Sequence, residues 1–168
     1  LQLFNNMDYN RAVERQNSAE NISRVLYPND NGPSGKALRL KQQYFFSSAS
    51  LQDLVRHYVA DYGTDFKKFP ELHIIQLNDT HPVVAIPELM RILMDDYNVG
   101  WDAAWDIVTK TFAYTNHTIL AEALEKWPIS IFQGLLPRIY QIVEELHRRL
   151  LIEPRQKYPN DHKKHRHM

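Results

Sequence analysis

The 168-residue chain contains no cysteine, only five glycines and no long apolar run. Without cysteine, it has no disulfide, no thiol nucleophile and no zinc site with cysteine ligands. Its glycines form neither a dinucleotide-binding nor a P-loop motif, and the HExxH and GxSxG motifs are also missing. No apolar stretch approaches the roughly 18 residues of a membrane span.

The chain also has no excess of either charge. It contains 20 basic and 20 acidic residues, so its overall charge favours neither a nucleic acid nor an anionic membrane as a partner. The length fits one domain with a sizeable core. The first residue is Leu1 rather than Met, and the segment after it does not resemble a signal peptide. We therefore expect a piece of a longer polypeptide.

Two segments combine a strand-like run with a polar ending. The first, residues 72–77, predicts a short buried strand from four apolar side chains, Leu72, Ile74, Ile75 and Leu77. Pro82 blocks a continuation of this strand, and a helical pattern follows it. The second segment, residues 112–115, is interpreted as a strand parallel to the first across a helical connection.

The polar residues after these strands form the one candidate constellation in the sequence. They are Asn78, Asp79, Thr80 and His81 after the first strand, and Asn116, His117 and Thr118 after the second. Ligands of α/β sheets bind beyond the carboxyl ends of the strands, so we expect Asp79, His81 and His117 at one sheet edge. In the alternative interpretation, Asn78 and Asp79 only form turn hydrogen bonds and His81 only packs against its neighbours.

The rest of the chain predicts a helix-rich α/β fold. Helices are expected around residues 8–15, over 36–62, near Pro87, after Gly100 and from Pro137, with a loop over 28–35. The side chains expected to face the core include Tyr44, Phe45 and Phe46 in the long helix and Ile139, Ile142, Val143, Leu146 and Leu150 in the last one. Pro154 is expected to kink or end that last helix.

Residues 154–168 form a basic, histidine-rich tail, and residues 1–153 are assigned to one domain. The tail has no apolar period, so we expect a solvated or partly disordered end rather than a metal or phosphate site. No metal site is predicted elsewhere in the chain.

Five motifs together resemble the glycogen and maltodextrin phosphorylases. They are ENISRVLYPNDN (20–31), RLKQQYF (39–45), QLNDTHP (76–82), AIPELMR (85–91) and FAYTNHT (112–118). Their order and approximate spacing are also similar to those of this family, from residue 4 to about residue 141. The resemblance covers nearly all of this chain and implies an internal fragment of the N-terminal half of such an enzyme.

The resemblance implies part of a Rossmann-like N-terminal domain in a two-domain, cytoplasmic glycosyltransferase. Such enzymes cleave a terminal α-1,4-glucan bond with inorganic phosphate and release glucose 1-phosphate with retention. They use pyridoxal phosphate, whose lysine belongs to the C-terminal half and is not in this chain. The implied partners are the glucan, phosphate, the remainder of the phosphorylase chain and a second copy in a homodimer, with no nucleic acid or membrane. The isolated chain is expected to be inactive.

The resemblance also implies residue roles. His117 matches a catalytic-site histidine that contacts the glucosyl unit, and its backbone carbonyl is expected near the anomeric carbon. Asn31 matches a glucose-hydroxyl ligand, and Asp30 belongs with it to a mobile gate loop. The other implied cleft residues are Asp79, His81 and Thr118.

One departure from the family pattern concerns regulation. Arg56 and His57 stand where muscle-type relatives have two arginines that bind an activating nucleotide. Because histidine lacks the bidentate guanidinium fork, we do not expect nucleotide activation. A second hypothesis is that the chain is a non-catalytic helical interaction module whose histidines are structural. Its apolar helix faces fit both hypotheses.

Overall fold

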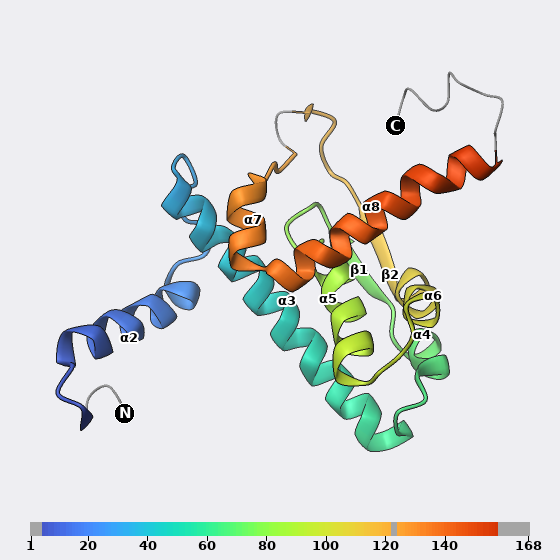
Figure 1. The fold of residues 1–168 in the computed structure, drawn as a ribbon, viewed down its shortest axis with the longest axis horizontal. Helices are drawn as coiled ribbons and strands as arrows, with labels where there is room; N and C mark the ends of the chain where they lie inside the picture. Colours follow the sequence, from blue (N-terminus) through green and yellow to red (C-terminus); the bar gives the residue numbers. More distant parts are fainter. Residues whose placement is uncertain (1–4, 122–123, 158–168) are drawn as a thin grey trace.

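The computed structural model describes residues 5–121 and 124–157 and shows a helix-rich α/β arrangement (Figure 1). Its elements in chain order are α2 (Tyr9–Arg24), α3 (Pro33–Tyr62), η1 (Phe66–Lys68), α4 (Phe69–Leu72), β1 (Ile75–Asn78), α5 (Ala85–Arg91), the π-helical η2 (Ile92–Asp96), α6 (Trp101–Thr111), β2 (Phe112–Thr115), α7 (Ile129–Leu135) and α8 (Pro137–Lys157). No helix in this described part is both long enough and apolar enough to cross a membrane.

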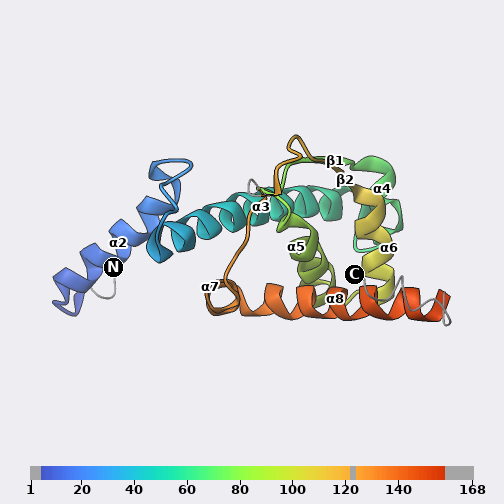
Figure 2. The same cartoon turned by 90° about the horizontal axis from the view of Figure 1, so that it is seen from above.

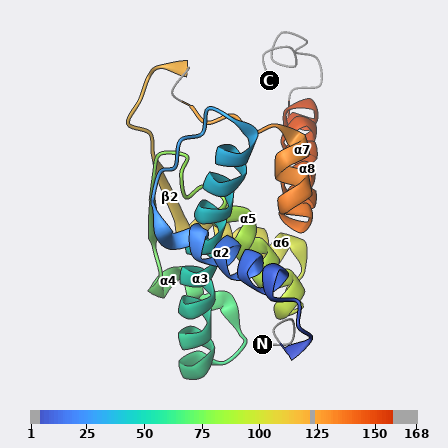
Figure 3. The ribbon, with the colours of Figure 1, turned by 90° about the vertical axis from the view of Figure 1, so that its left-hand side faces the viewer.

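The predicted parallel strand pair is confirmed. β1 and β2 pair in parallel, with Ile75 opposite Phe112 and Asn78 opposite Thr115. The chain passes from β1 to β2 through α5, η2 and α6, which separate the strands from α8 (Figure 2 and Figure 3). The carboxyl ends of both strands therefore lie at one edge, as a parallel pair requires.

The first strand is shorter and less buried than predicted. Leu72 belongs to α4 instead, and both Leu72 and Ile74 are exposed, so the prediction of a buried strand from residue 72 was wrong. The fully buried ring of Phe69 anchors the short helical turn of α4, whose end is closed by a hydrogen bond from His73 N–H to the Phe69 carbonyl. Leu77 is the buried residue of β1.

Helix α3 confirms the predicted long helix and extends it toward its N-terminus. It begins at Pro33, inside the predicted loop, because proline fits the first helical turn, where its missing N–H is not needed. Gly63 ends the helix with a φ of 74°, a left-handed conformation that favours glycine. Leu51, Val55 and Tyr58 are buried on one face.

Some of the predicted core side chains in α3 and α8 are exposed instead. Phe45 and Phe46 in α3 are exposed, and they pack edge-to-face on each other. In α8, Ile139 and Ile142 are buried, whereas Val143 and Leu150 are exposed. Helix α8 packs on α5 but extends beyond it, so its later apolar residues have less to pack against (Figure 1). It also continues past Pro154 to Lys157, while residues 158–168 of the predicted tail lie outside the described residues.

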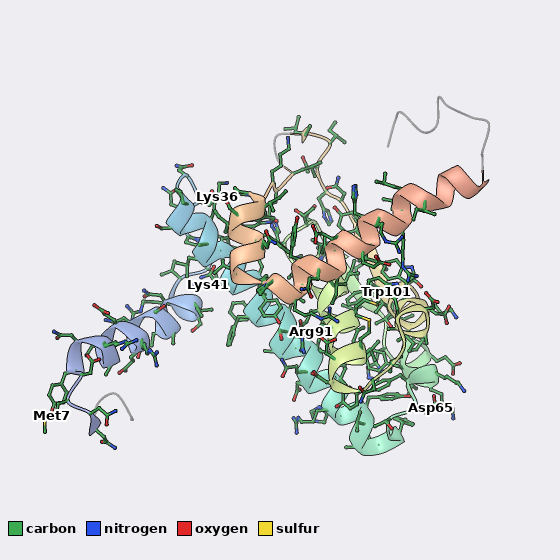
Figure 4. The ribbon with its side chains drawn as sticks, in the orientation of Figure 1. Met7, Lys36, Lys41, Asp65, Arg91 and Trp101 are labelled. Carbon is green, nitrogen blue, oxygen red and sulfur yellow. The ribbon has the colours of Figure 1, made fainter. Side chains whose placement is uncertain are left out.

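The core forms where α5, η2 and α6 pack against α3 and α4. Leu89, Met90, Leu93 and Ala104 are completely buried there. Glu88 is also 0% exposed, but its carboxylate accepts hydrogen bonds from Tyr44, Ser48 and Arg91, the last through two nitrogens. Arg91 lies beside α3 in Figure 4. A charge that is buried in this way requires such partners.

Helix α2 projects away from this body, and none of its residues is buried (Figure 1). Asp8 caps its start by accepting a hydrogen bond from Arg11 N–H. Met7 lies at the outer end of this projection, and its side chain is exposed (Figure 4).

Candidate functional site

The two strand ends are joined by Asp79 and His117. Asp79 N–H donates to the Thr115 carbonyl at 2.8 Å, which extends the strand pairing by one hydrogen bond. The backbone of Asp79 then turns into the left-handed region, with a φ of 59°. This turn is common for aspartate and directs the chain away from the strand.

The Asp79 carboxylate holds the segment after β2. It accepts the backbone N–H of His117 at 2.7 Å and lies 3.3 Å from the His117 Nδ1 atom. The backbone N–H donation is the main cause that lowers the pKa of Asp79 below its ordinary value of 3.8, because it favours the charged carboxylate. The His117 side chain is 57% exposed, so its ring is accessible.

A groove of about 250 Å³ lies at this junction. Its lining residues are Asp79, Thr80, His81, Asn116, His117, Thr118 and Leu124. The Asn116 side chain stabilises its rim by bonding to both the N–H and the carbonyl of Thr118. The predicted cleft residues Asp79, His81, His117 and Thr118 are thus brought together by the fold.

Neither Asp30 nor Asn31 is among the residues that line this groove. The Asp30 carboxylate is 3.6 Å from Arg39 Nη1, and Asp30 lines a neighbouring cavity of about 330 Å³. Asn31 is exposed, and its backbone N–H bonds to the side-chain oxygen of Asn29. Gly35 lies so close to this loop that a Cβ there would overlap the Asn29 carbonyl.

An ion pair that the sequence did not point to connects the two regions. Glu125 accepts hydrogen bonds from Arg39 at 2.9 Å, from Gln43 at 2.9 Å and from Thr80 at 3.1 Å. Arg39 Nη2 also lies 3.3 Å from His81 Nδ1. Arg39 falls inside one of the five sequence motifs, but nothing in the pattern around Glu125 indicates this contact across 86 positions.

Arg56 and His57 are far from the groove. They lie 17 and 18 residues after Arg39 on the same helix, roughly 25 Å along its axis. Both are exposed, and both contact Asp53: the Arg56 guanidinium bonds to its carboxylate and the His57 ring to its carbonyl.

The groove offers the chemistry of a site for a hydroxyl-rich ligand. A carboxylate accepts hydrogen bonds from hydroxyls, an imidazole donates or accepts one, and threonine hydroxyls do both. Within residues 5–121 and 124–157, no group of three or more histidine, aspartate or glutamate side chains is arranged to hold a metal ion.

Comparison with known proteins decides the family. The family model for carbohydrate phosphorylases matches residues 1–168. The chain belongs to this family. This phosphorylase chain is 53% identical over 166 residues to glycogen phosphorylase 2 of Dictyostelium discoideum. It is 54% identical over 168 residues to the brain form of human glycogen phosphorylase, and 52% identical over 158 residues to glycogen phosphorylase of Saccharomyces cerevisiae.

These matches cover 99%, 96% and 94% of the phosphorylase chain but only 17%, 20% and 17% of the three relatives. The chain therefore spans about a fifth of the length of the relatives that it matches. The resemblance that the five motifs indicated is confirmed.

Proposed function

We propose that this chain is the sugar-binding segment of an α-1,4-glucan phosphorylase. The complete enzyme would cleave a terminal glucosidic bond with inorganic phosphate and release glucose 1-phosphate with retention. The observation that carries this proposal is the groove at the carboxyl ends of two parallel strands, where Asp79, His81, His117 and Thr118 meet. The identity of more than 50% to glycogen phosphorylases supports it.

The residues of the groove would bind and orient the glucosyl unit. The exposed His117 ring would form a hydrogen bond with a sugar hydroxyl, while Asp79 fixes the His117 backbone. The remaining acceptor sites of the Asp79 carboxylate would receive hydroxyl protons. A backbone carbonyl that is held at His117 would favour the positive charge that develops at the anomeric carbon. His81 and Thr118 would add polar contacts along the rim, and Asp30 and Asn31 would close the entrance.

Pyridoxal phosphate is the cofactor that the family implies. The groove does not fit this cofactor, because none of its lining residues is a lysine that would carry it. We infer that the cofactor and the residues that bind phosphate are supplied by the remainder of the enzyme. No step of the chemistry assigned to this chain passes through the cofactor.

We also propose that β1 and β2 belong to a larger Rossmann-like sheet in the complete protein. An isolated two-stranded sheet is marginally stable, which supports its continuation by strands of the remaining polypeptide. A homodimer in the cytoplasm is part of the same proposal. Exposed apolar side chains at Met7, Val13 and Leu26 support an association surface near α2.

The direct test compares the isolated chain with the complete source polypeptide. We expect the complete protein to show pyridoxal absorbance and to form glucose 1-phosphate from glucan and phosphate, and the isolated chain to do neither. Turnover by the purified isolated chain would contradict the assignment of the cofactor to another segment. A complete protein without phosphorolysis would favour the alternative, a non-catalytic helical interaction module.

A further inference from the structure

The carboxylate of Glu125 is nearly buried and joins three separate segments. Its side chain is 12% exposed, and that of its partner Arg39 is 17% exposed. Oε1 accepts from the Arg39 guanidinium and from Gln43, both on α3, and Oε2 accepts from Thr80 in the turn after β1. A carboxylate with this many donors is well compensated for its burial.

Glu125 belongs to the connection between β2 and α7, which lacks extended regular structure in its described part. Such a segment is held in position by side-chain contacts rather than by the repeated backbone hydrogen bonds of a helix or sheet. Near its start, His117 is fixed by Asp79, and near its end Glu125 is fixed by Arg39. The groove residues His117 and Thr118 therefore lie on a connection that is attached at two points.

Glu125 does not line the groove itself. It lines the neighbouring cavity of about 330 Å³, together with Asp30 and Arg39. Arg39 also contacts Asp30 in the loop before α3 and lies over the Tyr27 ring at 5.5 Å. Glu125 contacts two residues that do line the groove: Oε2 accepts from Thr80, and Oε1 lies 3.4 Å from Nδ1 of His81. A change at Glu125 would therefore act on the groove through these contacts.

We infer that Glu125 is a positioning residue that sets the place of the His117–Thr118 rim through its pairing with Arg39 and Thr80. Its link to substrate rests on the proposed function, whereas its link to the rim rests on the contacts alone. Removing the carboxylate leaves the Arg39 guanidinium, Gln43 and Thr80 without their shared acceptor. The connection then keeps its attachment at Asp79 but loses the one at Glu125.

The test uses the complete source polypeptide with Glu125→Ala and the milder Glu125→Gln. The matched controls are Glu145→Ala and Glu145→Gln, because Glu145 pairs with two arginines on α8, away from the groove. Hydrogen exchange of a peptide that covers residues 116–121 reports how well the backbone amides of the rim are protected. Glucan phosphorolysis is measured on the same preparations.

We expect Glu125→Ala to raise the exchange rate at residues 116–118 by about tenfold, with Glu125→Gln giving a smaller increase, because Gln retains an acceptor oxygen. Exchange in α5 and α6 should stay unchanged, and kcat/KM for glucan should fall by about tenfold. The Glu145 variants should alter neither value. Unchanged exchange at the rim, or an equal rise in α5 and α6, would overturn the positioning role. If the unmodified protein forms no glucose 1-phosphate, the proposed function fails, and the exchange result still decides the role of Glu125.

Discussion

The backbone N–H of His117 donates to the carboxylate of Asp79 at 2.7 Å. Asp79, which directly follows β1, therefore fixes His117, which lies beyond the end of β2. Asp79 is itself held by its own N–H, which donates to Thr115 at the end of β2. The two bonds run in opposite directions between the strand ends. Together they join the carboxyl ends of the two parallel strands, and the groove lies at this junction.

The first prediction concerns the pH dependence of this junction. The pKa of Asp79 is lowered in the folded protein. The carboxylate therefore stabilises the fold fully at a pH above 3.8, its ordinary pKa, and this stabilisation is lost as the pH falls through the lower folded pKa. We expect Asp79→Asn to reduce the exchange protection of the His117 amide at pH 5 to 6. The difference from the unmodified protein should disappear once Asp79 is protonated. A difference that persists after Asp79 is fully protonated would contradict this origin, and Asp106→Asn, in an exposed pair with Lys110, is the control.

The second prediction concerns the buried carboxylate of Glu88. Glu88→Ala leaves Arg91, Tyr44 and Ser48 without their shared acceptor inside the core. Breaking a buried pair in this way typically costs about 3–5 kcal/mol. We expect a clear loss in the free energy of unfolding by urea, whereas Glu14→Ala on the exposed helix α2 should cost less than about 0.5 kcal/mol. Equal behaviour of the two variants would show that the buried network contributes little.

The third prediction tests the close approach of α3 to the loop that contains Asp30 and Asn31. A Cβ at Gly35 would overlap the Asn29 carbonyl, so Gly35→Ala should displace Asp30 and Asn31. In the complete enzyme we expect a higher KM for glucan with little change in the melting temperature. Gly134→Ala is the control, because a Cβ there meets open space within α7, and alanine favours a helix by roughly 0.5–1 kcal/mol. An unchanged KM in Gly35→Ala would separate this loop from substrate binding.

The fourth prediction concerns nucleotide regulation. Arg56 offers one guanidinium, already paired with Asp53, and His57 cannot provide a second fork. We expect AMP to change the activity of the complete enzyme by less than about twofold, which is within roughly 0.4 kcal/mol. Assays with and without AMP measure this directly. Strong activation that disappears in Arg56→Ala would show that the site is functional after all.

The sequence predicted the elements whose pattern is local. The 3.6-residue spacing in α3, α5 and α6 and the strand-like run before Asn78 were sufficient to place Asp79 and His117 at one edge. The apolar stripe of α8 was less informative, because burial at Ile142 and exposure at Leu150 depend on where the neighbouring helix ends. The exposure of Phe45 and Phe46 has the same cause: an apolar residue is buried only where a partner surface covers it.

The Glu125 contacts could not be predicted from the sequence. Arg39 and Glu125 are 86 positions apart, and Glu125 lies in a connection without a periodic pattern. Only the packing of α3 beside the strand ends brings these charges together. The assignment of residues 1–153 and 154–168 to a domain and a tail stays a prediction, although α8 runs across that boundary to Lys157.

The most direct measurement is the activity and melting temperature of His117→Ala in the complete enzyme, on one preparation. If the ring contacts the glucosyl unit, its removal leaves a sugar hydroxyl unpaired, which typically costs about 1–3 kcal/mol, or roughly ten- to hundredfold in rate. We expect this loss in kcat/KM, and partly in kcat, with little change in melting temperature, because the ring is largely exposed and Asp79 binds the backbone instead. A large drop in melting temperature with unchanged kcat/KM would contradict the site and make His117 a structural residue.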